Sequence, residues 1–135
     1  MKSIANRLFL FAAAALSLGT AAYGQNILKA NVPFAFHSPA GTTSAGQYTV
    51  RVENAGSGYL AQIRDRATGH ASVSLTNRLD YKAGADIAPR LVFRCTETSC
   101  QLSEIWTRDG GFSLPVKHVH DPEYVASVPL VAAGD

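Results

Sequence analysis

The chain has 135 residues, a formal net charge of +2 and a 47% share of hydrophobic residues, which suits one domain with a modest core. Lys2 and Arg7 are the only charged residues before position 25, so ten basic and ten acidic residues remain after it. That balance supplies neither the clustered positive charge of nucleic-acid-binding domains nor a polybasic patch for anionic lipid. We therefore expect no nucleic-acid partner.

The first 24 residues are ordered like a secretory signal peptide. Lys2 and Arg7 precede the apolar run Leu8–Leu18, which is shorter than the roughly 20 residues that span a bilayer. Ala22-Tyr23-Gly24 fits the small-x-small cleavage rule, so we predict a cut after Gly24, with Ala22 as the alternative. The competing interpretation is an N-terminal helix packed on the domain. Export would place residues 25–135 in the periplasm or the medium, with no stable membrane insertion.

Apolar and polar side chains alternate through most of the remaining chain, which is typical of β-strands. The first strand is expected over residues 28–36, where Pro33 indicates an edge or a bulge because it cannot donate a ladder hydrogen bond. In the strand expected over 71–77, Val73 and Leu75 should point inward. Further strands are expected over 47–53, 59–65, 90–95, 100–107 and 112–119.

These strands predict an all-β fold, a single antiparallel β-sandwich or small barrel of about seven or eight short strands. The domain should cover residues 25–122, and residues 123–135 should form an apolar tail or a last strand. Arg108-Asp109-Gly110-Gly111 is a strong turn signal because glycine tolerates positive φ. The aromatic residues expected in the core are Phe34, Phe36, Tyr48, Phe93 and Trp106.

Cys95 and Cys100 are expected to form a structural disulfide. The Thr96–Ser99 hairpin loop between their strands places them opposite each other on one face. Export would place the two cysteines in an oxidising compartment, which favours the disulfide. Because the bridge closes a small ring, it should add only about 2 kcal/mol to the free energy of unfolding. The alternatives are a redox pair, which lacks the usual C-x-x-C context, a pair of free thiols, and half of a zinc site with two further ligands.

His118, His120 and Asp121 are weak candidates for a metal site. Residues i and i+2 of a strand face the same side, so both imidazoles could bind one cation, and Asp121 could add an oxygen ligand. The interpretation we favour is a polar strand end. His37 and His70 are expected to be surface groups.

Glu104 alternates with Leu102 and Trp106, which places this carboxylate toward the core. It could be a general acid with a raised pKa, but a β-bulge that turns it outward is simpler. Neither a G-x-S-x-G elbow nor a phosphate-binding glycine loop occurs in the sequence. We expect no catalytic residue and no cofactor.

Several short motifs occur in a fixed order along the chain: Asn31-Val32-Pro33-Phe34-Ala35-Phe36, Ala45-Gly46-Gln47-Tyr48-Thr49-Val50, Leu91-Val92-Phe93, Leu102-Ser103-Glu104-Ile105-Trp106 and Leu114-Pro115. Together they resemble a family of small exported bacterial proteins of unknown activity. The resemblance covers most of residues 28–116 and implies an all-β exported domain, with no catalytic or binding residue to carry over. The chain departs from the family pattern at the two cysteines and in its apolar C-terminal segment.

Three functions remain open from the sequence. The leading one is a non-catalytic binding or structural module with a partner in the cell envelope or outside the cell. The second is a carrier of a small apolar ligand, which needs a hollow interior rather than one filled by large side chains. The third is a metal-binding protein or metal-dependent enzyme that uses His118, His120 and Asp121.

Overall fold

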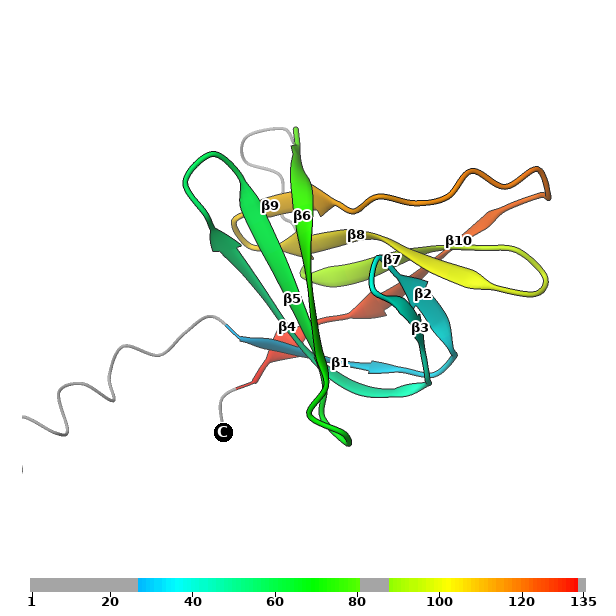
Figure 1. The fold of residues 1–135 in the computed structure, drawn as a ribbon, viewed down its shortest axis with the longest axis horizontal. Helices are drawn as coiled ribbons and strands as arrows, with labels where there is room; N and C mark the ends of the chain where they lie inside the picture. The colour runs from blue at the N-terminus through cyan, green and yellow to red at the C-terminus, as the bar shows by residue number, and fades with distance from the viewer. Residues whose placement is uncertain (1–26, 81–87, 134–135) are drawn as a thin grey trace, which may run out of the picture.

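The computed structural model describes residues 27–80 and 88–133, and its regular secondary structure there is entirely β (Figure 1). The all-β prediction is confirmed, while the predicted signal peptide, residues 1–24, lies outside the described residues. The strands are β1 (Leu28–Val32), β2 (Phe36–Ser38), β3 (Gly41–Thr43), β4 (Gly46–Asn54), β5 (Tyr59–Asp65), β6 (Ala71–Leu79), β7 (Arg90–Cys95), β8 (Cys100–Thr107), β9 (Gly110–Ser113), β10 (Tyr124–Pro129) and β11 (Val131–Ala132).

The strands form one mixed sheet whose order is β10-β7-β8-β9-β6-β5-β4-β1-β11. Neighbours along this path are antiparallel, and the short β2–β3 hairpin joins it through one parallel pair between His37 and Gln101. Strand β6 links the two halves of the sheet, because residues 71–76 pair with β5 and residues 77–79 pair with β9.

The two ends of this strand path are consecutive in the chain. Leu130 alone separates β10, which pairs with β7, from β11, which pairs with β1. Leu130 is buried, and its N–H donates to the carbonyl of Pro89 at 3.0 Å. The segment expected to be a tail or a last strand therefore contributes pairing at both ends of the path.

Two predicted strands are shorter than expected. The strand over 28–36 is interrupted after Val32, where Pro33 removes a backbone donor, and resumes as β2. The strand over 112–119 ends at Ser113. Beyond it, the N–H of Leu114 donates to the carbonyl of Ser103 at 2.9 Å, and the Gln101 side chain bonds the backbone of Lys117. These contacts take the place of the backbone hydrogen bonds that a longer strand would make.

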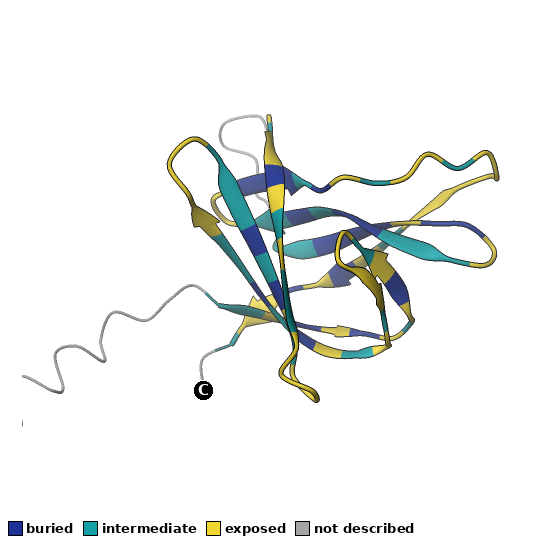
Figure 2. Ribbon diagram, viewed as in Figure 1, coloured by how far each residue is buried: buried dark blue, intermediate teal, exposed yellow. Residues whose placement is uncertain are grey.

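The prediction that Val73 and Leu75 point inward is wrong. Exposed positions of β6 are yellow in Figure 2, and Val73 and Leu75 are 59% and 70% exposed, which places them on the outer face of the strand. The reason is the register of the β5–β6 hairpin, which pairs Ala61 with Ser74. Directly opposed residues share a face, so the buried Ala61 carries Ser74 inward and leaves Val73 and Leu75 outside.

A β-bulge in β8 turns Glu104 outward, as the simpler interpretation held. The β7–β8 register shifts between Val92 and Phe93, so that Ser103 is left without an opposing residue. Leu102 and Ile105 are both buried as a result, whereas Glu104 lies on the outer face. The same shift corrects the core assignment of Trp106, which lies half-buried on the outer face with its indole N–H donating to Glu104 at 3.1 Å.

The other predicted core aromatics pack as expected. Phe36, Tyr48 and Phe93 are buried, and Phe34 is half-buried against them. The ring of Phe36 lies edge-on to those of Tyr48 and Phe93, with centroids 5.3 and 5.2 Å apart. The Tyr48 hydroxyl donates to the carbonyl of Ser44, which satisfies its polar atom. Large side chains therefore fill this part of the interior.

Candidate binding site

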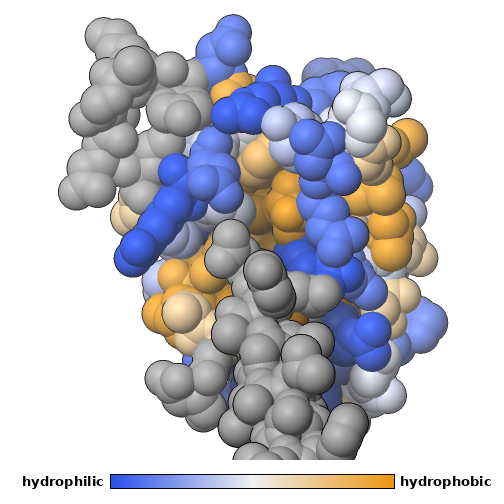
Figure 3. All heavy atoms as spheres, turned by 90° about the vertical axis from the view of Figure 1, so that its left-hand side faces the viewer, coloured by the Kyte–Doolittle hydropathy of each residue, from blue (hydrophilic) through white to orange (hydrophobic). Residues whose placement is uncertain are grey.

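A cavity of about 870 Å³ opens at the end of the molecule that carries the β8–β9 turn and the start of β1. Figure 3 faces this end and shows apolar atoms near its centre, with hydrophilic atoms beside them and further apolar atoms toward both sides. The apolar lining includes residues of β1, β4, β9 and the β10–β11 segment, among them Leu28, Val50, Val52, Phe112, Leu130 and Val131. The polar lining consists of Tyr59, Arg78, Thr107, Arg108 and Asp109.

The interior is hollow at this end because inward side chains become smaller along β4. Tyr48 fills the interior at one end of the strand, whereas Val50 and Val52 face the cavity at the other. Val52 is opposed by Ala61 on β5, which in turn is opposed by Ser74 on β6. Three small side chains in a row across adjacent strands leave space that aromatic residues occupy elsewhere.

Tyr59 and Arg78 form the polar wall of the cavity. The Arg78 guanidinium donates through Nη1 to the Tyr59 hydroxyl at 2.7 Å and through Nη2 to the backbone carbonyl of Asp109 at 3.1 Å. The ring of Tyr59 packs against that of Phe112, with centroids 5.0 Å apart. These contacts join β5, the end of β6 and the β8–β9 turn around the opening.

Sequence reasoning missed this site. The predicted strand ended at Asn77, and its assigned facing would have turned Arg78 outward. In the observed register Arg78 opposes the buried Phe112 and follows the inward-facing Thr76 by two residues. The facing of Arg78 could have been predicted from β5: the residues of β6 that oppose the inward residues of β5 across the hairpin must also point inward.

The predicted cysteine pair lies together, away from the cavity lining. Cys95 and Cys100 are opposed in the β7–β8 register, with sulfur atoms 2.06 Å apart and Cα atoms 4.0 Å apart. Cys95 is buried in the core. The loop between them is held by Thr96, whose N–H donates to the carbonyl of Ser99 at 2.7 Å. The pair is at disulfide-bonding distance, as expected.

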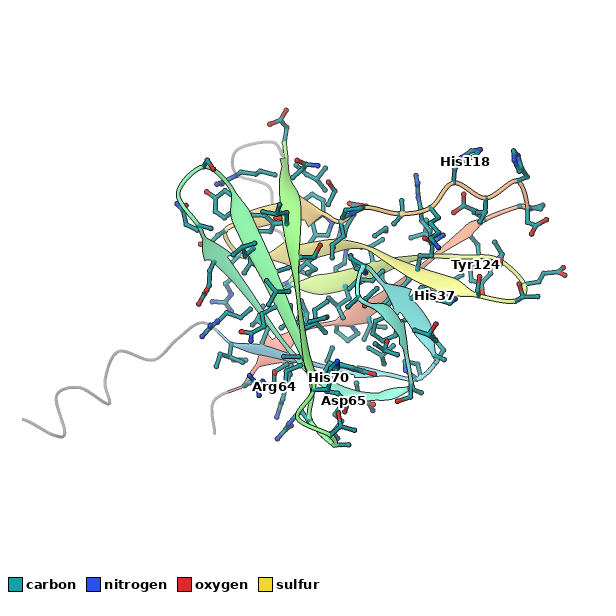
Figure 4. All side chains as sticks on the ribbon, in the orientation of Figure 1. His37, Arg64, Asp65, His70, His118 and Tyr124 are labelled. Atoms are coloured by element: carbon teal, nitrogen blue, oxygen red, sulfur yellow. A yellow bond between two sulfur atoms is a disulfide. The ribbon has the colours of Figure 1, made fainter. Side chains whose placement is uncertain are left out.

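The weak metal candidates are only partly brought together. The rings of His118 and His120 lie edge to face with centroids 5.2 Å apart, in an exposed segment between β9 and β10. Within residues 27–80 and 88–133, no three His, Cys, Asp or Glu residues group as metal ligands would, so Asp121 does not complete a set. Figure 4 places His118 on the far side of the view from the cavity.

His37 and His70 are exposed, as predicted for surface groups. His37 Nδ1 lies 3.0 Å from the Thr42 hydroxyl across the β2–β3 hairpin. His70 closes the β5–β6 turn, where its backbone carbonyl accepts from Asp65 at 2.8 Å. The His37 ring therefore has a local contact, whereas His70 contributes to the turn through its backbone.

Comparison of the chain with protein-family models, with curated proteins and with solved structures finds no match. In the part of the chain that the structure describes, no helix has the length and apolar character needed to cross a bilayer.

Proposed function

We propose that this protein is a non-catalytic binding module that holds a small molecule with an apolar portion in the cavity at the β8–β9 end. The observation that carries the proposal is the hollow of about 870 Å³, whose volume falls within the roughly 300–1,000 Å³ of small-molecule sites. Its lining combines an apolar floor with a few polar groups at the opening, which is the composition of such sites.

We also propose that the sheet closes into a small barrel around this interior. The support is the pairing of β10 with β7 and of β11 with β1, since Leu130 alone separates those two strands. A closed barrel has no unpaired edge and can enclose a ligand between its walls.

The proposed place of action is outside the cytoplasm, after removal of residues 1–24. A cysteine pair at disulfide distance is compatible with an exported protein. An intact mass that corresponds to a chain beginning at Gln25, measured on protein from the extracytoplasmic fraction, would support this localisation.

The binding proposal is tested with a fluorescent apolar probe such as N-phenyl-1-naphthylamine and protein expressed from the full sequence. We expect saturable binding at one site, with displacement by decanol. Val52→Trp should fill the cavity and weaken probe binding about tenfold or more, since most of the apolar contact is lost.

Val73→Trp is the matched control, because it adds the same side chain to the exposed outer face of β6. It should leave probe affinity unchanged. Probe binding that does not saturate, or that falls equally in both variants, would show that the cavity is not a binding site.

A further inference from the structure

Arg78 lies at the opening of the cavity and is held in place by two neutral acceptors. Its Nη1 donates to the Tyr59 hydroxyl and its Nη2 to the backbone carbonyl of Asp109. These acceptors come from β5 and from the β8–β9 turn, so the guanidinium bridges two sides of the opening. Its position is therefore fixed by the fold, as a binding group must be.

Among the residues that the structure describes, the lining of the cavity carries a net positive charge. The charged residues of the lining are Arg78, Arg108 and Asp109, which leaves an excess of one positive charge. Among the described residues, the ion pair within 4.0 Å joins Arg51 to Glu53 and leaves Arg78 without a carboxylate partner. An apolar cavity with one uncompensated cation at its opening is complementary to an amphipathic anion.

The donors of this wall suit a carboxylate in particular. A guanidinium has five N–H donors in a planar fork that matches the two oxygens of a carboxylate. Two of the five are used within the protein, and the Tyr59 hydroxyl, which accepts from Arg78, keeps its own hydrogen free to donate. A bound carboxylate would meet both groups while its alkyl chain lies on Val52 and Phe112.

We propose that the ligand is a fatty-acid-like carboxylate, with Arg78 as the residue that binds its headgroup and Tyr59 as a second donor. This inference rests on the proposed binding function. The alternative is a purely structural Arg78, which ties β6 to the β8–β9 turn and makes no difference to ligand charge.

The test compares three ligands of equal chain length: decanoate, decanol and decyltrimethylammonium. Isothermal titration calorimetry at pH 7.5 and low salt measures each dissociation constant with protein expressed from the full sequence. We expect decanoate to bind about tenfold more tightly than decanol, a modest gain because Arg78 is exposed to solvent, and the cation to bind most weakly. The preference for decanoate should diminish as salt is added.

Arg78→Met should abolish the preference by weakening decanoate about tenfold, with decanol affinity kept within about twofold. Tyr59→Phe is the second variant, because it keeps the ring and the charge and should weaken decanoate alone. Arg64→Met is the matched control. Arg64 lies beside the β5–β6 turn (Figure 4), bonds the carbonyl of Gly69 and does not line the cavity, so its loss should leave all three ligands unaffected.

The outcomes separate this inference from the function on which it depends. If decanol binds but decanoate has no advantage, the cavity is a binding site and the role of Arg78 is refuted. If Arg78→Met weakens decanol and decanoate equally, Arg78 is structural, and if only Arg108→Met removes the preference, the headgroup residue is Arg108. If no ligand binds the wild-type protein, the proposed function and this inference both fail.

Discussion

Gly111→Ala should destabilise the protein through a single contact. Gly111 is buried in β9 and opposes Trp106 on β8, whose ring lies over it. A Cβ at Gly111 would lie 2.6 Å from Cζ3 and 2.7 Å from Cη2 of that ring. The indole is restrained by its bond to Glu104 and by the Arg90 guanidinium, whose Cζ is 5.1 Å from the ring centroid.

The expected cost follows from how far the ring must move. It has to recede by roughly 0.9 Å to reach the ~3.5 Å of an ordinary carbon contact. Overpacking of this kind costs about 1–3 kcal/mol. Replacing glycine by alanine offsets about 0.4–1 kcal/mol of that cost, because it lowers the conformational entropy of the unfolded chain. We therefore expect a net loss of about 1–2 kcal/mol, or a fall in Tm of roughly 5–10 °C.

Urea unfolding followed by far-UV circular dichroism measures the loss, and emission from the single tryptophan reports the displaced ring. In a Trp106→Ala background the same Gly111→Ala change should be neutral or slightly stabilising, since nothing then opposes the methyl group. Gly58→Ala is the control, because an added Cβ there meets no atom within 4 Å. A Gly111→Ala protein with wild-type stability and unchanged emission would refute this packing.

Two further changes test the assignments of the sheet. Leu75→Lys should alter the free energy of unfolding by no more than about 0.5 kcal/mol, because Leu75 is 70% exposed. A loss above about 2 kcal/mol, measured by urea unfolding, would show that Leu75 is buried in the core. Replacing Cys95 and Cys100 together by alanine should lower the free energy of unfolding by about 2 kcal/mol. The intact mass of the wild type should rise by two hydrogen atoms on reduction, and no such rise would show that the bond is absent.

The clearest periodicities predicted the best-defined parts of the fold. The strand expected over 59–65 coincides with β5, and that over 47–53 lies within β4 with one more residue at each end. Side chains alternate along both strands, and the face that carries Tyr48, Val50, Ala61 and Ile63 is buried. The cysteine opposition followed from the same alternation and a short loop.

The prediction that Trp106 lies in the core is wrong because of a β-bulge, which the alternation of side chains does not reveal. One extra residue in β8 reverses the facing of every residue after it, so an aromatic that alternates with Leu102 ends on the outer face. The sequence allowed a bulge for Glu104, but a bulge moves Trp106 as well. The two residues form one hydrogen-bonded unit, and a consistent interpretation must place them together.

The sequence did not predict the polar wall of the cavity because the facing of β6 was assigned wrongly. A strand with Val73 and Leu75 on one face and Ser72, Ser74 and Thr76 on the other suggests that the apolar face is buried, yet the structure has the opposite arrangement. The free-energy cost of this arrangement is small. The Thr76 hydroxyl donates to the carbonyl of Tyr59 at 3.0 Å and the Ser74 hydroxyl to the carbonyl of Leu75 at 3.1 Å, and exposed apolar side chains are common on protein surfaces.

The facing of β6 is decided instead by its neighbour. Strand β5 must bury Ala61 and Ile63, and the tight turn to β6, in which Gly69 at φ 75° donates to the carbonyl of Asp65, fixes the pairing of Ile63 with Ser72. Once that pair is set, Arg78 must face the interior, six residues further along the same face. The guanidinium at the cavity opening is therefore a consequence of the β5–β6 turn, and shifting that turn by one residue would remove it from the site.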